Sequence, residues 1–147
     1  MSIFETKWKA HLANPHRLAI LLVGGHPGSG KTTWALAKQE EDPEKILVLD
    51  DPCMHKSIWE TFCPGKHHTV IIADPFIALG SASYNEKIVR EKLHLSDHQS
   101  IWWSHFLFPD EPDTVAHRAR KGGKPLSDRM KGRFVVSPQT IWLPFGF

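Results

Sequence analysis

An α/β fold with a parallel β-sheet covered by helices is predicted by two features of this sequence. Runs of almost continuous apolar residues, typical of strands that are buried on both faces, occur at residues 17–23, 45–51 and 68–74. Segments with a helical pattern separate or follow them, at residues 32–40, 54–62 and 85–95. Strands that alternate with helices build parallel sheets from βαβ units. We expect about five strands in one domain that spans residues 1–147.

The remaining elements are predicted at the two ends of the chain. Residues 1–16 indicate an N-terminal helical arm, which the Asn14-Pro15 pair ends. Residues 100–108 are apolar enough for a fourth strand, and Pro109 follows them. A last strand is expected at residues 134–136 or 141–143.

The junction between the first strand and the next helix carries a phosphate-binding loop. Residues 25–32 read G-H-P-G-S-G-K-T, which fits the pattern G-x-x-x-x-G-K-[ST] between a strand and a helix. Glycines let backbone N–H groups surround phosphate oxygens, and the helix N-terminus adds the positive end of its dipole. The sequence therefore predicts a P-loop fold of the NTPase and kinase class that binds ATP and Mg²⁺.

Each residue type in this loop has an expected role. Lys31 places a positive charge at the β- and γ-phosphates, the Thr32 hydroxyl is a Mg²⁺ ligand, and Thr33 can bond the α-phosphate. The predicted nucleotide-binding residues are Gly25, His26, Pro27, Gly28, Ser29, Gly30, Lys31, Thr32 and Thr33.

Carboxylates follow the next two predicted strands. Asp50 and Asp51 end the second strand, and Asp74 ends the third. Ligands of open α/β sheets bind beyond the carboxyl ends of the strands, where the P-loop also lies. Asp50 or Asp51 is the candidate base for an acceptor hydroxyl, and Asp74 is the candidate contact to Mg²⁺, through water, or to the acceptor. The alternative role for each is to cap the following helix.

A basic segment at about residues 113–133 is predicted to form a lid. It holds seven of the eighteen Lys and Arg residues, and Gly122-Gly123 provides a hinge. A mobile basic segment can close over a triphosphate and neutralise charge in the transition state. Arg118 and Arg120 are the expected lid arginines, and a solvated basic helix face is the alternative.

Missing motifs favour a kinase over other P-loop proteins. The chain has no N-K-x-D element of the kind by which switch GTPases read guanine, and no apolar strand that ends in Asp-Glu as in motor ATPases. A small kinase instead needs an acceptor base and a cationic clamp, and the chain offers candidates for both.

Three further segments resemble phage-type 5′-polynucleotide kinases. Residues 70–75, V-I-I-A-D-P, are similar to their third-strand element; residues 49–51, L-D-D, to their Asp-Asp element; and residues 118–130 to their lid. The resemblance implies a five-stranded kinase fold, ATP with Mg²⁺, and transfer of the γ-phosphoryl group to a hydroxyl on nucleic acid, with DNA expected rather than RNA.

The chain departs from this family where the acceptor would bind. Pro52-Cys53-Met54 stands where the family has an aromatic residue and an arginine, so Lys56 is the nearest basic candidate for an acceptor contact. A hydroxymethyl group on a modified pyrimidine in DNA would suit a changed acceptor site, as in related small phage kinases. Trp59, Trp102 and Trp103 are candidates for stacking on bases. A small-molecule or nucleotide kinase and a non-kinase regulatory NTPase remain as alternatives.

Composition limits the other classes of partner. The net charge is only +2, and no apolar run reaches the roughly 18 residues of a membrane span. The first residues lack the apolar core of a signal peptide. We therefore expect a cytoplasmic protein with no membrane partner, and the sequence identifies no protein partner.

Overall fold

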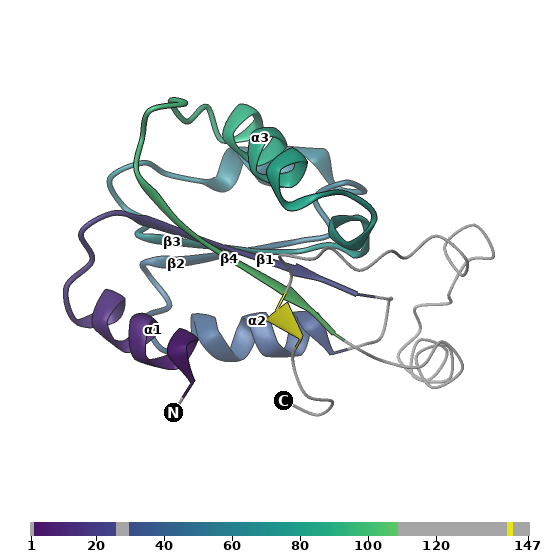
Figure 1. Cartoon of the computed structure of the whole chain (residues 1–147). Helices are drawn as coiled ribbons and strands as arrows, with labels where there is room; N and C mark the ends of the chain where they lie inside the picture. The colour runs from purple at the N-terminus through teal and green to yellow at the C-terminus, as the bar shows by residue number, and fades with distance from the viewer. Residues whose placement is uncertain (1, 26–29, 109–140, 143–147) are drawn as a thin grey trace.

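A parallel sheet lies between two layers of helices (Figure 1). The computed structural model describes residues 2–25, 30–108 and 141–142. The strand order is β2-β3-β1-β4-β5. The strands are β1 (Leu18–Gly24), β2 (Ile46–Asp50), β3 (Thr69–Ala73), β4 (Ile101–Leu107) and β5 (Ile141–Trp142). The predicted α/β class and the parallel, helix-flanked sheet are confirmed.

The predicted count of about five strands holds only in part. Four strands have five to seven residues each, whereas β5 consists of two residues that pair with the end of β4. Of the two predicted positions for a last strand, β5 falls within 141–143, and 134–136 lies outside the described residues. Within the described ranges the sheet therefore has four full-length strands.

The register of the sheet brings the carboxyl ends of its strands together. β1 is central and pairs in parallel with β3 and β4. Ala73 is the partner of Val23 on one side and of Asp50 on the other. The P-loop and the acids that follow β2 and β3 therefore begin at the same edge, as the sequence predicted.

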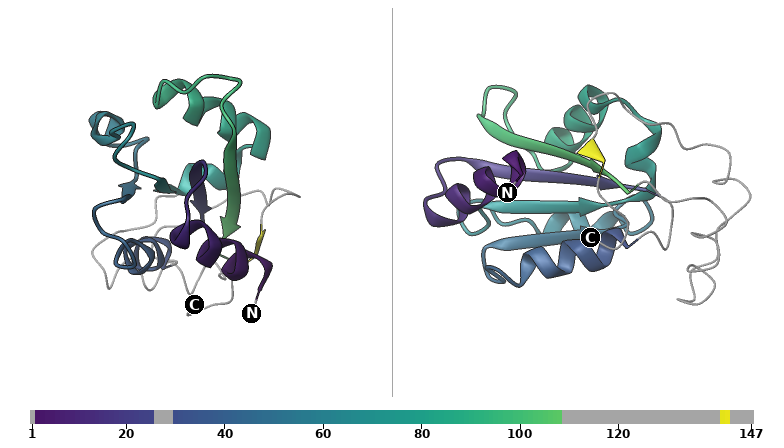
Figure 2. Two further views of the ribbon diagram at one scale, coloured as in Figure 1. Left: turned by 90° about the vertical axis from the view of Figure 1, so that its left-hand side faces the viewer. Right: turned by 60° about the horizontal axis from the view of Figure 1, so that its bottom comes forward.

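Helices α1 (Ile3–Ala13) and α2 (Lys31–Gln39) cover one face of the sheet (Figure 2). Alternate residues of β1 (Ala19, Leu21 and Val23) face these helices and pack with Trp8, Trp34 and Phe106. Large aromatic side chains dominate this layer, and Phe4 contacts Phe106 edge-on at 4.8 Å between ring centroids. Burial of aromatic rings is the main stabilising term on this face.

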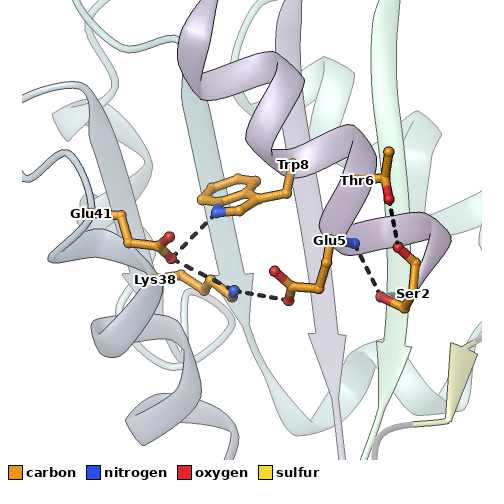
Figure 3. Close-up of polar contacts among 6 residues, drawn as sticks. All are labelled: Ser2, Glu5, Thr6, Trp8, Lys38 and Glu41. Carbon is orange, nitrogen blue, oxygen red and sulfur yellow. Dashed lines mark hydrogen bonds and ion pairs between the residues drawn. The ribbon is translucent and has the colours of Figure 1, made fainter.

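The predicted N-terminal arm is a helix that belongs to the core. Ser2 caps α1 by accepting the Glu5 N–H at 3.1 Å, and the Trp8 side chain is fully buried. Figure 3 shows Lys38 of α2 between Glu5, at 3.1 Å, and Glu41, at 3.6 Å. The Glu41 carboxylate also accepts the Trp8 indole N–H at 3.3 Å. α1 is thus held by both packing and polar contacts.

The opposite face is covered by α3 (Ala82–Lys92) and two short 3₁₀ helices, η1 (Lys56–Thr61) and η2 (Pro75–Leu79). The helix predicted at residues 54–62 is the short 3₁₀ helix η1. It starts later than predicted, because the Asp51 carbonyl accepts the Met54 and His55 N–H groups in a turn that precedes it. The helix predicted at 85–95 begins earlier, where Ser81 caps it, and ends before His94, which has a positive φ.

Trp102 and Trp103 lie on opposite faces of β4, as expected for neighbouring strand residues. Trp102 packs against the aromatic layer under α1, and Trp103 packs beneath α3, where the Arg90 guanidinium lies 5.7 Å from its ring centroid. Both rings are half-buried, so neither of these two stacking candidates is exposed. Within the described ranges, no helix is long and apolar enough to cross a membrane.

Candidate functional site

The two ends of the phosphate loop have backbone conformations that favour glycine. Gly25, which follows β1, has φ +145°, and Gly30, the residue before α2, has φ +100°. Side chains with a Cβ rarely adopt such angles, which explains why the motif requires glycine there. His26, Pro27, Gly28 and Ser29 lie outside the described residues. Gly25 and Gly30 therefore mark the two ends of a loop that connects β1 to the N-terminus of α2.

The first residues of α2 connect this loop to the end of β2. Lys31 is 5% exposed, and Thr33 faces solvent. Between them, the Thr32 hydroxyl donates a hydrogen bond to Asp50 Oδ1 at 2.9 Å. The structure therefore brings together two residues that the sequence singled out separately. A hydroxyl whose proton is held by a carboxylate keeps its oxygen lone pairs free to bind a cation.

Asp51 begins the loop after β2 with φ +49°, in the left-handed region that Asp tolerates better than most residues. Its backbone N–H donates to the Ala73 carbonyl at 2.8 Å, which extends the pairing of β2 and β3 by one residue. The two neighbouring acids thus differ: Asp50 is bonded to α2 through its side chain, whereas Asp51 is bonded to β3 through its backbone N–H.

Asp74 links the loops that follow β2 and β3. Its carboxylate is 2% exposed, and it accepts the Cys53 N–H through Oδ2 at 3.0 Å and the Phe76 N–H through Oδ1 at 2.8 Å. The second bond makes Asp74 the N-cap of η2, which is the capping role that the sequence left as an alternative. Each oxygen keeps a second lone pair, so the contact to Mg²⁺ or to the acceptor stays a prediction.

A cavity of about 530 Å³ opens beside these loops, on the α3 side of the sheet. This volume is typical of pockets for small molecules. Its walls are mainly apolar, and the large side chains among them come from η1, η2, α3 and the loop after β2. They are Met54, Trp59, Phe76, Ile77, Tyr84 and Ile88.

Few polar groups line this cavity. They include Asp74, Cys53 and Asn85, whose side-chain amide donates to the Ile77 carbonyl at 2.9 Å. Partial burial, together with the neighbouring Asp74 carboxylate, raises the pKa of the Cys53 thiol to about 12. Cys53 is therefore a neutral thiol at physiological pH rather than a nucleophile.

Several lining residues were not predicted from the sequence. Trp59 was a stacking candidate, but Phe76, Tyr84 and Asn85 were missed. Phe76 and Tyr84 are exposed aromatic residues within ten positions of Asp74, and that spacing was the available signal. Lys56, the predicted acceptor contact, is exposed at the start of η1 and is not among the lining residues.

The predicted lid, with Arg118 and Arg120, lies outside the described residues. In the described part of the chain no group of three or more His, Cys, Asp or Glu side chains could hold a metal ion. The Thr32 hydroxyl and the Asp50 carboxylate nevertheless fit Mg²⁺, which is commonly held by one or two protein oxygens together with phosphates and water.

Comparison with solved structures shows which fold this is. A gluconokinase from Sinorhizobium meliloti 1021 matches 90% of this chain and 86% of its own, with a TM-score of 0.52 and 16% sequence identity. The chain has the same fold as this gluconokinase. A second match, to the structure of APE1195, covers 72% and 68% of the two chains at 19% identity, but its TM-score of 0.41 is too low to support an inference. No family model and no curated protein matches the sequence.

Proposed function

We propose that this protein is an ATP-dependent phosphotransferase, in which Asp50 receives the proton of an acceptor hydroxyl. The observation that carries the proposal is the hydrogen bond from Thr32 to Asp50. This bond places the Asp50 carboxylate beside Thr32, which directly follows the phosphate-binding Lys31. A general base must lie within hydrogen-bonding reach of the reacting group, and the bond from Thr32 holds the Asp50 carboxylate beside the phosphate loop.

The proposed reaction is an in-line transfer. The acceptor oxygen forms a bond to the γ-phosphorus as the bond from that phosphorus to the β–γ bridging oxygen breaks, and ADP leaves with that oxygen. The hydroxyl proton passes to the Asp50 carboxylate, while Lys31 stabilises charge on the phosphates. Thr32, oriented by its hydrogen bond to Asp50, would hold Mg²⁺, and the ion would neutralise negative charge on the triphosphate. In this scheme Arg118 and Arg120 remain the proposed lid arginines.

For the acceptor, we propose a hydroxyl on a nucleic acid, DNA in particular, whose base occupies the cavity beside Asp74. The flat side chains of Trp59, Phe76 and Tyr84 suit a planar ring better than a polyol. A polyhydroxy acid, such as the substrate implied by the name gluconokinase, needs many hydrogen-bond donors and a cation. The described lining residues of this cavity include no Lys or Arg.

Transfer of labelled phosphate tests this function directly. The protein is incubated with γ-labelled ATP, Mg²⁺ and separate acceptors: 5′-hydroxyl DNA, 5′-hydroxyl RNA, DNA with hydroxymethyl pyrimidines, free nucleosides and gluconate. Label in a polynucleotide is the expected result. Label only in a small molecule would identify a small-molecule kinase, and ATP binding without transfer would identify a regulatory NTPase.

Two substitutions locate the base. Asn at position 50 can still accept the Thr32 hydrogen bond but cannot take a proton, so Asp50→Asn is expected to lower turnover by about 10²–10⁴-fold. Asp51→Asn is the matched control and is expected to keep most of its turnover. If the two effects are reversed, Asp51 is the base.

One substitution tests the cavity as the acceptor site. Tyr84 is 59% exposed on α3, so Tyr84→Ala should leave the fold intact. We expect it to raise the KM for the acceptor with little change in the KM for ATP. Lys87→Ala, on an exposed position of the same helix that does not line the cavity, is the control. If both variants have the same KM for the acceptor, the acceptor does not bind in this cavity.

A further inference from the structure

A second large cavity lies at the opposite end of the sheet, where the strands begin. It has a volume of about 540 Å³ and is formed by the connections that lead into β1, β2, β3 and β4. In Figure 1 this end is on the left, and the left view of Figure 2 looks onto it. The phosphate loop, which follows the last residue of β1, is at the other end of that strand. The two sites are therefore separated by the length of the sheet.

Positive charge is concentrated in this second cavity, which we call the basic pocket. Its charged lining residues are Arg17, Lys45 and Lys66, and none of its described lining residues is Asp or Glu. The whole chain has a net charge of only +2, so these three cations exceed the charge of the entire molecule. Like charges that gather in one concave site without carboxylates among them attract an anion.

Histidines complete the polar lining of the basic pocket. His16, His67, His68 and His94 contribute imidazole groups from three different connections. His68 Nε2 is bonded to the Asp42 carboxylate at 3.0 Å. Burial, together with the charge of Lys66, lowers the pKa of His67. These imidazole groups add polar ring atoms beside the permanent charges of Arg17, Lys45 and Lys66.

One wall of the basic pocket is flat and apolar. The rings of Phe62 and His67 stack, with centroids 6.0 Å apart and planes inclined by 27°, and Leu95 lines the same cavity. A cavity that combines permanent cations with flat rings matches a nucleotide, which has a phosphate and a base. The volume is that of a small ligand rather than of a double helix.

We propose that the basic pocket binds one nucleotide unit of a single-stranded nucleic acid, with its phosphates at Arg17, Lys45 and Lys66. The base would lie against Phe62. A site of this kind holds a strand without reading its sequence, because charge and stacking are the same for every nucleotide. The proposal does not depend on the identity of the phosphate acceptor, since binding requires neither ATP nor Mg²⁺.

Binding of a labelled oligonucleotide tests the basic pocket. The probe is a fluorescein-labelled oligothymidylate of about 15 nucleotides, and its fluorescence anisotropy is measured with the full chain at 50 and 150 mM KCl without ATP. Lys45→Gln and Lys66→Gln are each expected to weaken binding by roughly 3–10-fold and to reduce the salt slope by about one. Lys87→Gln, an exposed lysine on α3 outside the pocket, changes net charge equally and is expected to stay within about twofold of the wild type.

Two outcomes would overturn the proposal. If Lys45→Gln and Lys66→Gln bind the probe as Lys87→Gln does, the basic pocket does not contact the strand. If inorganic tripolyphosphate displaces the oligonucleotide at an equal concentration of phosphate groups, the pocket is a site for free polyphosphate. A failure of the phosphate-transfer assay would leave this binding result untouched, so the two proposals can be rejected separately.

Discussion

The Asp74 carboxylate accepts the backbone N–H of Cys53 at 3.0 Å, and this bond joins the loop after β2 to the loop after β3. Its other oxygen caps η2 through the N–H of Phe76. A single buried side chain thus fixes two walls of the cavity that we propose as the acceptor site. Asp74 lies one position beyond the Val23–Ala73 pair of the sheet. The residue that holds the cavity walls is therefore itself positioned by the core of the sheet.

Replacing Asp74 with Asn should therefore reduce stability. Asn keeps one acceptor oxygen but turns an NH₂ group toward the second backbone N–H, which leaves a buried donor without an acceptor. The free energy of unfolding in urea is expected to fall by about 1–3 kcal/mol. Asp97→Asn, at an exposed loop position, is the control. Unchanged stability combined with weaker Mg²⁺ dependence would instead assign Asp74 to the metal.

Thr32 should be needed for its hydroxyl rather than for its shape. Valine has the same outline but cannot donate to Asp50 or bind Mg²⁺, so Thr32→Val is expected to lower kcat/KM by about tenfold or more, which corresponds to at least ~1.4 kcal/mol. Thr32→Ser keeps the hydroxyl and is expected to retain most of the activity. Steady-state kinetics over a range of Mg²⁺ concentrations measure the effect. Equal activity of the valine and serine variants would contradict the proposed role.

Gly30 should be required for its backbone angle. An alanine at φ +100° is strained, so Gly30→Ala is expected to lower the free energy of unfolding by about 1–2 kcal/mol and to weaken ATP binding. Gly65→Ala is a matched control, because Gly65 has φ +86° with open space around it and lies far from the phosphate loop. It should lose stability but keep its ATP affinity, as measured by calorimetric titration. Equal loss of ATP affinity in both variants would indicate a global effect.

Cys53 should react slowly with alkylating agents. Because burial and the Asp74 carboxylate raise its pKa to about 12, very little thiolate is present at pH 8. In a Cys63→Ser background, alkylation of Cys53 by iodoacetamide at pH 8 is expected to be at least about tenfold slower in the folded protein than in urea. Mass spectrometry of timed samples gives both rates. A folded-state rate as fast as the unfolded one would mean that Asp74 does not act on the thiol.

Stability should decrease in mild acid because of His11. Burial and the neighbouring His68 hold the pKa of His11 below its ordinary value of 6.5. The unfolded chain takes up a proton on this residue as the pH falls through 6.5, whereas the folded chain does so only at a lower pH. The free energy of unfolding therefore falls between these two values and does not change with this group above them.

Comparison of two glutamine variants isolates this contribution. His11 bonds Thr69 Oγ1 at 2.8 Å, and glutamine can replace that bond without titrating. The loss of unfolding free energy between pH 7.5 and pH 5 is expected to be smaller in His11→Gln than in the wild type. His16→Gln, at an exposed position, should follow the wild type. If His11→Gln follows it as well, His11 does not cause the acid sensitivity.

The sequence by itself was sufficient for the features that depend on local pattern. The strand at residues 68–74, the strand at 100–108 and the turn from a strand into a helix at Gly30 and Lys31 all follow from apolar runs and a glycine motif, because a few neighbouring residues determine them. The same reasoning located Asp50, Asp51 and Asp74 at one edge, since the ends of parallel strands meet there.

Only the tertiary structure decided what those residues contact. The bond from Thr32 to Asp50 joins residues 18 positions apart, and the bond from Cys53 to Asp74 spans 21. Local propensity contains no information on such distances. The basic pocket collects charges from three connections that are remote in sequence. Trp8 is buried with partners on α2 and β4 as well as on its own helix. Contacts of this kind form only when the sheet packs between its two layers of helices. A local motif was therefore enough to predict the phosphate site, whereas the cavities could be found only in the folded structure.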